Sequence, residues 1–187
     1  MSQFSLFGAA AAEPSLDDLG GVLLAGGHWV RSGDTARLSV VVSDRWRADG
    51  LALEYDLRGV CGAEAVVRAE DGWSARTAFT AALAVEAARW TRGANEGPPR
   101  EFSLTAGGLR LWALAAGRPD EGGFLLGTPR IDAVLHLAAG AQLSRLGLAG
   151  VSIGVRGGPG WRITSAKRVR RFVELVGPPP EGVDRWL

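Results

Sequence analysis

Apolar and polar side chains alternate along residues 35–42, where Leu38 and Val40 share one side of the chain and Arg37 and Ser39 the other. Since successive side chains of a β-strand point to opposite faces, this spacing predicts a strand with one buried and one exposed face. A turn-forming stretch, Ser-Gly-Asp, comes immediately before it. We therefore expect a β-hairpin whose first arm lies just upstream.

The segment before this hairpin, residues 15–27, has the pattern of a helix. Ser15 can cap its N-terminus, two aspartates follow in the first turn, and glycines close it. Gly20, Gly21 and Gly26 would each cost an isolated helix about 1 kcal/mol relative to alanine, so we expect a partner backbone to pack closely there. The elements predicted for this half are a helix over 15–27, a hairpin of 28–31 and 35–42, a helix over 44–58, a hairpin of 63–70 and 74–79, and a helix over 81–92.

The same order of elements restarts after a stretch rich in glycine and proline, residues 93–100. The second copy is shorter, because residues 118–122 have the composition of a solvated turn and leave one strand in place of the first hairpin. An ordinary α+β domain with chance self-similarity is the alternative. The elements predicted here are a helix over 109–117, a strand over 123–127, a helix over 131–146, a hairpin of 150–155 and 161–164, and a helix over 165–176.

We accordingly divide the chain into five segments. These are an N-terminal arm (1–14), a first half (15–93), a linker (94–104), a second half (105–177) and a C-terminal tail (178–187). The predicted fold class is α+β, with the order αββαββα in each half and an abbreviated second half.

The composition narrows the functions that the chain could serve. Its 21 basic and 20 acidic side chains give a net charge of +1, so binding to nucleic acid would require a local basic patch. Cys61 is the only cysteine, which excludes an intramolecular disulfide and a cysteine zinc site and favours a reducing, cytoplasmic location. We expect no cofactor and no bound metal. We also expect no membrane association, since no uncharged apolar run has membrane-spanning length.

Two short apolar segments that end in glycine open the two halves. Residues 19–27 read L-G-G-V-L-L-A-G-G, and residues 109–117 read L-R-L-W-A-L-A-A-G. Together with the order of elements behind each segment, they resemble the single-chain LAGLIDADG homing endonucleases and their non-cleaving relatives, over residues 15–177. The resemblance implies that the two motif helices pack along a pseudo-twofold axis and that two sheets form a saddle over double-stranded DNA. It also implies a monomer, because the chain already contains its own pseudo-dimer.

The eighth motif position carries the catalytic acid in that family, one carboxylate per helix, which holds the divalent metal at the scissile phosphate. Gly26 and Ala116 stand at these positions here, and neither side chain can bind a metal. A shifted alignment would place Glu121 in the second acid position, but Pro119 would end the helix before it. We therefore expect a catalytically inactive member and no enzymatic activity.

The polar faces of the predicted strands carry arginine repeatedly, and guanidinium groups pair well with phosphates and with guanine edges. Hydroxyl groups of Ser and Thr add phosphate contacts. The last helix adds a basic flank, which could be a second phosphate contact or a solvated surface. The residues predicted to contact DNA are Arg37, Ser39, Arg68, Arg76, Arg156, Arg162, Thr164 and Lys167.

These features predict a non-catalytic DNA-binding protein, with regulation of transcription as one use. Two alternatives stay open. The first is an adaptor that binds a protein partner on the same scaffold, which the near-zero net charge favours. The second is a metal-dependent endonuclease that uses Glu121. The strand arginines could also be no more than the solvent face of two sheets.

Overall fold

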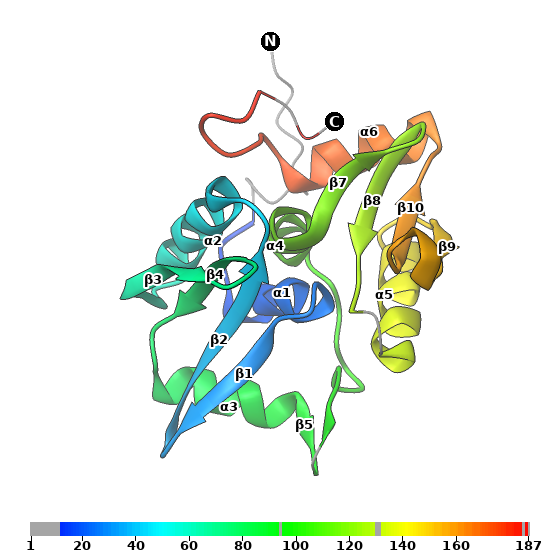
Figure 1. Ribbon diagram of the computed structural model, residues 1–187. Helices are drawn as coiled ribbons and strands as arrows, with labels where there is room; N and C mark the ends of the chain where they lie inside the picture. Colours follow the sequence, from blue (N-terminus) through cyan, green and yellow to red (C-terminus); the bar gives the residue numbers. More distant parts are fainter. Residues whose placement is uncertain (1–11, 94, 130–131, 185, 187) are drawn as a thin grey trace. The chain divides into compact units, whose positions relative to one another are not determined.

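The computed structural model describes residues 12–93, 95–129, 132–184 and 186. Most of the predicted N-terminal arm lies outside the described residues. The described part of the chain is a mixed α+β structure with six α-helices, two four-stranded antiparallel sheets and one two-stranded ribbon (Figure 1). By its internal contacts the chain divides into two compact units, Gly26–Phe102 on the one hand and Met1–Ala25 with Ser103–Leu187 on the other.

The unit Gly26–Phe102 is built on the first sheet, whose strand order is β1-β2-β4-β3. Alternate residues of β2, from Ala36 to Val42, are buried on the side where the helices α2 and α3 pack, as the alternation predicts. Helix α3 begins where the Thr80 side chain accepts a hydrogen bond from the Leu83 amide at 3.1 Å. The elements are β1 (His28–Ser32), β2 (Thr35–Val42), α2 (Arg45–Leu57), β3 (Cys61–Ala69), β4 (Gly72–Thr77) and α3 (Ala81–Arg89).

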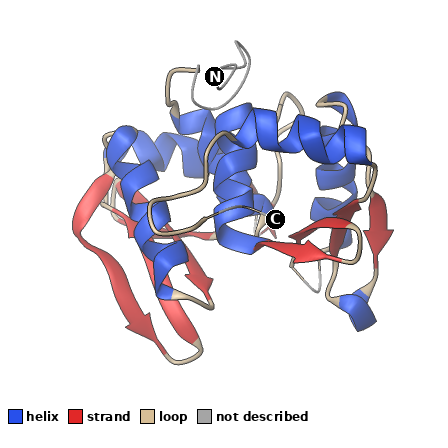
Figure 2. Cartoon of the chain, turned by 90° about the horizontal axis from the view of Figure 1, so that it is seen from above, coloured by secondary structure: helices blue, strands red, loops and turns tan. Residues whose placement is uncertain are grey.

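The second sheet lies in the other unit and repeats this order as β7-β8-β10-β9. Its helix-covered side is apolar, and Phe124 of β8 stacks against Phe172 of α6 with ring centroids 4.6 Å apart. In each sheet the helices lie against one side, as Figure 2 shows. The elements are β7 (Gly117–Asp120), β8 (Gly123–Gly127), α5 (Ala133–Arg145), β9 (Val151–Ile153), β10 (Gly160–Ile163) and α6 (Ala166–Val176).

One element of the second half differs from the prediction. Residues 118–120, expected in a solvated turn, belong to β7, so the first hairpin of this half is complete but short. Pro119 is tolerated because β7 is an edge strand, where a missing amide donor leaves no neighbour unpaired on its outer side. The second half is therefore abbreviated in the length of its strands and not in their number.

The two lead helices pack directly on each other inside one unit. A 3₁₀ turn (η1, Leu16–Leu19) and α1 (Gly20–Leu24) contact α4 (Ala106–Ala116). A Cβ atom added at Gly21 would lie 1.8 Å from the carbonyl oxygen of Gly108, so the approach of the two backbones requires a glycine at position 21. The predicted close contact at Gly21 is confirmed.

The compact units and the predicted halves do not share their boundaries. Residues 15–25, predicted to open the first half, pack with the unit that contains the second. The predicted linker contains a two-stranded ribbon of β5 (Thr91–Arg92) and β6 (Asn95–Glu96). In the predicted tail, the Trp186 indole N–H donates to the Gly177 carbonyl at 2.8 Å, which ties the tail to the end of α6.

None of the helices in the described residues has both the length and the apolar character needed to cross a membrane.

Candidate functional site

A row of polar side chains crosses the first sheet on the face that points away from α2 and α3, which we call the outer face. His28 of β1 pairs with Ser39 of β2, and Ser39 pairs with Arg76 of β4. Directly opposed residues of antiparallel strands share a face, so these three side chains lie in line. Arg37 lies two residues from Ser39 on the same strand and therefore on the same face. Three predicted contacts, Arg37, Ser39 and Arg76, are thus brought together.

Neither arginine of this row is neutralised by a carboxylate. The Arg37 guanidinium lies over the Phe79 ring at 4.6 Å, and its Nε is buried without a hydrogen-bond partner. The Nε of Arg76 donates to the Ser74 hydroxyl at 3.0 Å. Among the described residues, no acidic side chain forms an ion pair with either one. Stacking and hydrogen bonding fix both guanidinium groups while leaving their charge uncompensated.

Ser39 has a different place from the one that the sequence predicts. Its side chain is buried, and its hydroxyl lies 3.2 Å from that of Ser74, which is also buried. Because the Ser74 hydroxyl accepts a hydrogen bond from the Arg76 guanidinium, this pair of hydroxyls helps to hold the arginine in place. Ser39 therefore positions the row, and its burial keeps it from reaching a partner directly.

Arg68 was expected beside these arginines, and the register of β3 places it on the opposite face. Arg68 pairs with Trp73, and its neighbour Val66 pairs with the buried Ala75. A shift of register between Cys61 and Val66 marks a bulge, which strand alternation in the sequence does not reveal. The Arg68 guanidinium instead stacks on Trp73 at 5.0 Å, together with Arg45 at 5.1 Å.

The outer face of the second sheet also carries arginine, but there its charge is compensated. The Nε of Arg162 donates to Asp120 Oδ2 at 2.6 Å across the strand between them. The hydrogen bond from Arg162 is the largest cause of a lowered pKa for the Asp120 carboxyl, helped by a backbone hydrogen bond. Asp120 is thus ionised and pairs with the arginine that the sequence assigns to DNA.

Two further predicted contacts lie outside the strands. Arg156 is exposed in a 3₁₀ turn, η2 (Val155–Gly157), in the connection between the two predicted hairpin arms. Thr164 is exposed and directly follows the last residue of β10. Gly158 directly follows η2 with a positive φ of 78°, a conformation that glycine adopts without strain.

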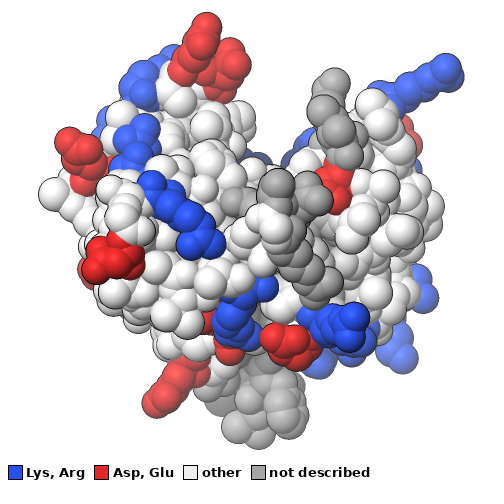
Figure 3. Space-filling model, turned by 90° about the horizontal axis from the view of Figure 1, so that it is seen from below, with Lys and Arg blue, Asp and Glu red and all other residues white. Residues whose placement is uncertain are grey.

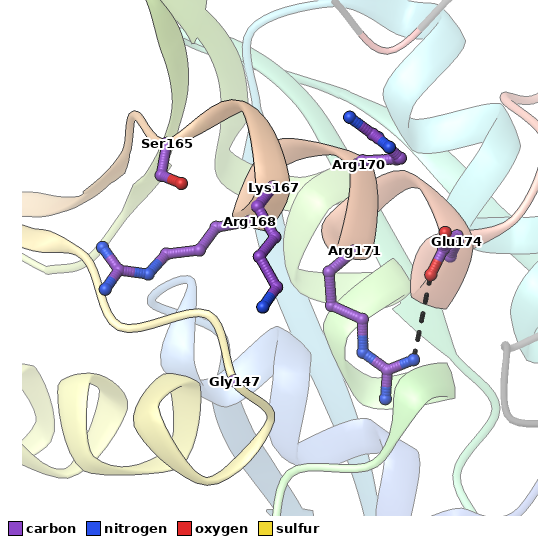
Figure 4. A pocket seen from close by; sticks show the side chains of 7 residues that line it. All are labelled: Gly147, Ser165, Lys167, Arg168, Arg170, Arg171 and Glu174. Carbon is purple, nitrogen blue, oxygen red and sulfur yellow. Dashed lines mark ion pairs between the residues drawn. The ribbon is translucent and has the colours of Figure 1, made fainter.

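Lys167, the last predicted contact, is exposed on α6 and lines a cavity of ≈ 620 Å³ (Figure 4). The same cavity is lined by other cationic side chains of this helix. Elsewhere, on the face of the molecule that Figure 3 draws, basic and acidic side chains of the described residues are interspersed among uncharged ones. This distribution agrees with the net charge of +1.

Gly26 and Ala116 stand where the resemblance to the LAGLIDADG family implies acidic residues. Gly26 follows the end of α1 with a positive φ of 99°, and Ala116 is the last residue of α4. Glu121 lies in the exposed turn after β7 and not on the helix, so the shifted alignment is wrong. Within the described parts of the chain, no group of three or more His, Cys, Asp or Glu side chains could hold a metal ion.

A hydrogen-bonded network around His136 is invisible in the sequence. His136 Nδ1 lies 2.9 Å from the Thr128 hydroxyl, and His136 Nε2 lies 2.8 Å from the Ser152 hydroxyl. The imidazole also stacks on Trp161, with ring centroids 5.0 Å apart. These contacts join α5 to β9 and β10, and no spacing along the chain could have identified them. They fasten the helix to the sheet.

No known family model matches the chain, and no curated protein matches it with significant similarity.

Proposed function

We propose that the protein binds double-stranded DNA without cleaving it, through the outer face of the first sheet. The observation that carries the proposal is the pair Arg37 and Arg76, two oriented guanidinium groups on neighbouring strands with no carboxylate partner among the described residues. Guanidinium groups form bidentate, charge-assisted hydrogen bonds with phosphate oxygens. The phosphate backbone of DNA is an extended anion, and a row of guanidinium groups can bind several of its phosphates.

The repeated element order supports a LAGLIDADG-like scaffold with a pseudo-twofold axis and a saddle. Both sheets have the order first, second, fourth, third strand, and the two lead helices pack through Gly21 and Gly108. Small residues at that contact are what the resemblance implies. We propose that this scaffold acts as a monomer in the cytoplasm, where regulation of transcription is one use of DNA binding.

The absence of carboxylates at the motif positions supports binding without cleavage. Phosphodiester hydrolysis by this class of site uses metal ions held by acidic side chains. Gly26 and Ala116 offer none, and Glu121 lies off the helix. Plasmid DNA should therefore remain uncut when the protein is supplied with magnesium or manganese ions.

Fluorescence polarisation with a labelled random duplex tests the proposal. The wild-type chain should bind at low salt and lose affinity as salt rises, since phosphate contacts release counterions. The double variant Arg37→Ala/Arg76→Ala should bind about tenfold more weakly or worse, because hydrogen bonds to charged groups contribute about 1.5–3 kcal/mol each. Its affinity should also depend less steeply on salt.

The matched control is Arg45→Ala/Arg68→Ala, which removes the same formal charge from α2 and β3, where both arginines stack on Trp73. Its duplex affinity should stay close to that of the wild type. Equal losses in both double variants would show that only net charge matters. Absence of any salt-sensitive binding by the wild type would sink the proposal and favour the protein-adaptor alternative.

A further inference from the structure

The cavity beside α6 is strongly cationic. Its lining contains four cationic side chains, Lys167, Arg168, Arg170 and Arg171, against one carboxylate, Glu174, with Gly147 and Ser165 at its edge. Its ≈ 620 Å³ fall within the range of about 300–1,000 Å³ that is usual for small-ligand sites. Figure 4 shows Lys167 and Arg168 extending from α6 on the side of the segment that contains Gly147, while Arg171 pairs with Glu174 and Arg170 points away from the other cations.

These cations gain little from neighbouring acids. The one ion pair that the described residues form within this lining joins Arg171 to Glu174 at 3.9 Å, between side chains that are 40% and 47% exposed. Exposed pairs of that length are screened by solvent and contribute little. Lys167 and Arg168 form no ion pair with any described carboxylate. The positive charge of the cavity is therefore left almost uncompensated.

The position of the cations on the helix also opposes the stability of the helix. Lys167 and Arg168 lie in the first turn of α6, at the positive end of its macrodipole, and no acid accompanies them. The Ser165 hydroxyl makes no capping hydrogen bond, whereas the side chains of Thr80, Thr105 and Asp132 cap other helices of the chain. An anion in the cavity would satisfy both the cations and the free end of the helix.

The helix that presents these charges is firmly held. Phe172 is fully buried and packs on Phe124, and the other end of α6 is capped where Arg110 donates to the Val176 carbonyl at 2.9 Å. The backbone that carries Lys167, Arg168 and Arg171 is therefore fixed before any ligand arrives. The helix itself therefore needs no ordering when an anion binds, which lowers the entropic cost of binding.

We propose that this cavity binds a compact anion that carries two or more phosphate groups. A cavity lined by four cations and one carboxylate matches an anion with several charged oxygens better than it matches a single carboxylate. The phosphates could belong to a free oligophosphate or to a DNA backbone, which share this chemistry. The inference is independent of the outer-face arginines of the first sheet, which lie in the other compact unit.

Isothermal titration calorimetry of the full chain with sodium triphosphate tests the site. The wild type should bind saturably at low salt, and Lys167→Ala/Arg168→Ala should bind about tenfold more weakly or worse. Because both side chains are exposed, this variant should fold normally by circular dichroism. Glu174→Gln, which removes the one carboxylate of the lining, should bind triphosphate more tightly than the wild type.

The matched control is again Arg45→Ala/Arg68→Ala, which removes the same charge at positions distant in the sequence. It should bind triphosphate as the wild type does. A duplex added to the triphosphate complex then separates the two sources. Competition assigns the cavity to DNA phosphates, and independent binding assigns it to a free oligophosphate.

Two results would overturn the inference. One is the absence of triphosphate binding by the wild type together with unchanged duplex affinity in Lys167→Ala/Arg168→Ala. The other is an equal loss in the control variant. A loss of duplex binding in Arg37→Ala/Arg76→Ala with intact triphosphate binding concerns the first sheet alone, so the two proposals can fail separately.

Discussion

The two four-stranded sheets of this chain share one strand order and differ in the charge of their outer faces. On the first sheet, Arg37 and Arg76 have no carboxylate partner among the described residues. On the second, Arg162 is bound to Asp120 at 2.6 Å. Strands β1 and β2 have five and eight residues, whereas β7 and β8 have four and five.

The two sheets are alike on their helix-covered sides and differ on their outer faces. The apolar residues on the helix-covered sides, such as Leu38 in the first sheet and Phe124 in the second, are buried in both. Burying these side chains removes apolar surface from water, and this burial requires the helix on that side. The outer faces differ in their charged side chains, since one presents arginines without a carboxylate partner among the described residues and the other an ion pair.

Substitution at the contact of the two lead helices should have the largest effect. In Gly21→Ala, the added Cβ would lie 1.8 Å from the Gly108 carbonyl oxygen, and a backbone cannot yield as a flexible side chain does. We expect a loss of about 3 kcal/mol in the free energy of unfolding, which exceeds the helix-propensity gain of about 1 kcal/mol. Urea denaturation followed by circular dichroism measures it.

The control for this variant is Gly154→Ala. Gly154 has a negative φ of −84°, and a methyl group added there would have no neighbouring atom within 4 Å. Its unfolding free energy should change by no more than about 0.5 kcal/mol. A Gly21→Ala protein as stable as the wild type would contradict the close packing of α1 on α4.

Removing a buried polar group should have a smaller effect and should raise the free energy of unfolding. In the first half, the Tyr55 hydroxyl is buried without a hydrogen-bond partner, whereas in the second the Trp112 indole N–H donates to the Gly127 carbonyl at 2.7 Å. Tyr55→Phe removes an unsatisfied group, so the free energy of unfolding should rise by about 1 kcal/mol. Thermal unfolding of both proteins decides the sign, and a marked destabilisation would reveal a partner for the hydroxyl.

The pH dependence of the same variant sharpens this point. Burial raises the pKa of Tyr55 above its ordinary value of 10.0. The unfolded tyrosine therefore ionises first, and the wild type loses stability as pH rises above about 10. Tyr55→Phe should show a shallower alkaline decline in unfolding free energy, and parallel curves would argue against the burial of this side chain.

The smallest effect should come from the second sheet itself. Asp120→Asn releases Arg162, so duplex affinity should rise by roughly twofold if freed strand arginines bind phosphate, since exposed ion pairs are weak.

The same variant should also change the response of stability to acid. The pKa of the Asp120 carboxyl is lower in the folded protein than in the unfolded chain, where it is about 4. The ion pair therefore stabilises the wild type above about pH 4, and this stabilisation is lost as the pH falls through the folded-state pKa. The variant should lack that acid-dependent part, as urea titrations between neutral and acidic pH would show.

Local pattern was sufficient for most of the elements. Alternation placed β2 at Thr35–Val42, and the apolar run placed β8 at Gly123–Gly127, with the bounds that the structure has. Both predictions depend on side chains that lie next to each other in sequence. Pro119 misled the prediction for β7 because proline marks turns and edge strands alike, and only pairing with β8 distinguishes them.

The candidate site was predicted less completely, because its partners are distant in sequence. Strand alternation put Arg37 and Arg76 on an outer face, and the register confirms that they share it. The register set at the β3–β4 turn pairs Arg68 with Trp73 and puts it on the other face, and the fold brought Asp120 to Arg162 across a strand. A pairing register and a cross-strand ion pair depend on neighbouring strands, which local periodicity does not contain.

The sequence by itself determined the period of each strand and helix, the lack of acids at Gly26 and Ala116, and the concentration of positive charge on the last helix. These are properties of residue type and spacing, which burial of apolar side chains converts into local structure. Only the tertiary structure decided which arginines keep a free charge, because compensation depends on distance in space. It also decided that the cations of α6 line one cavity, since that requires the segment at Gly147 to lie beside the helix.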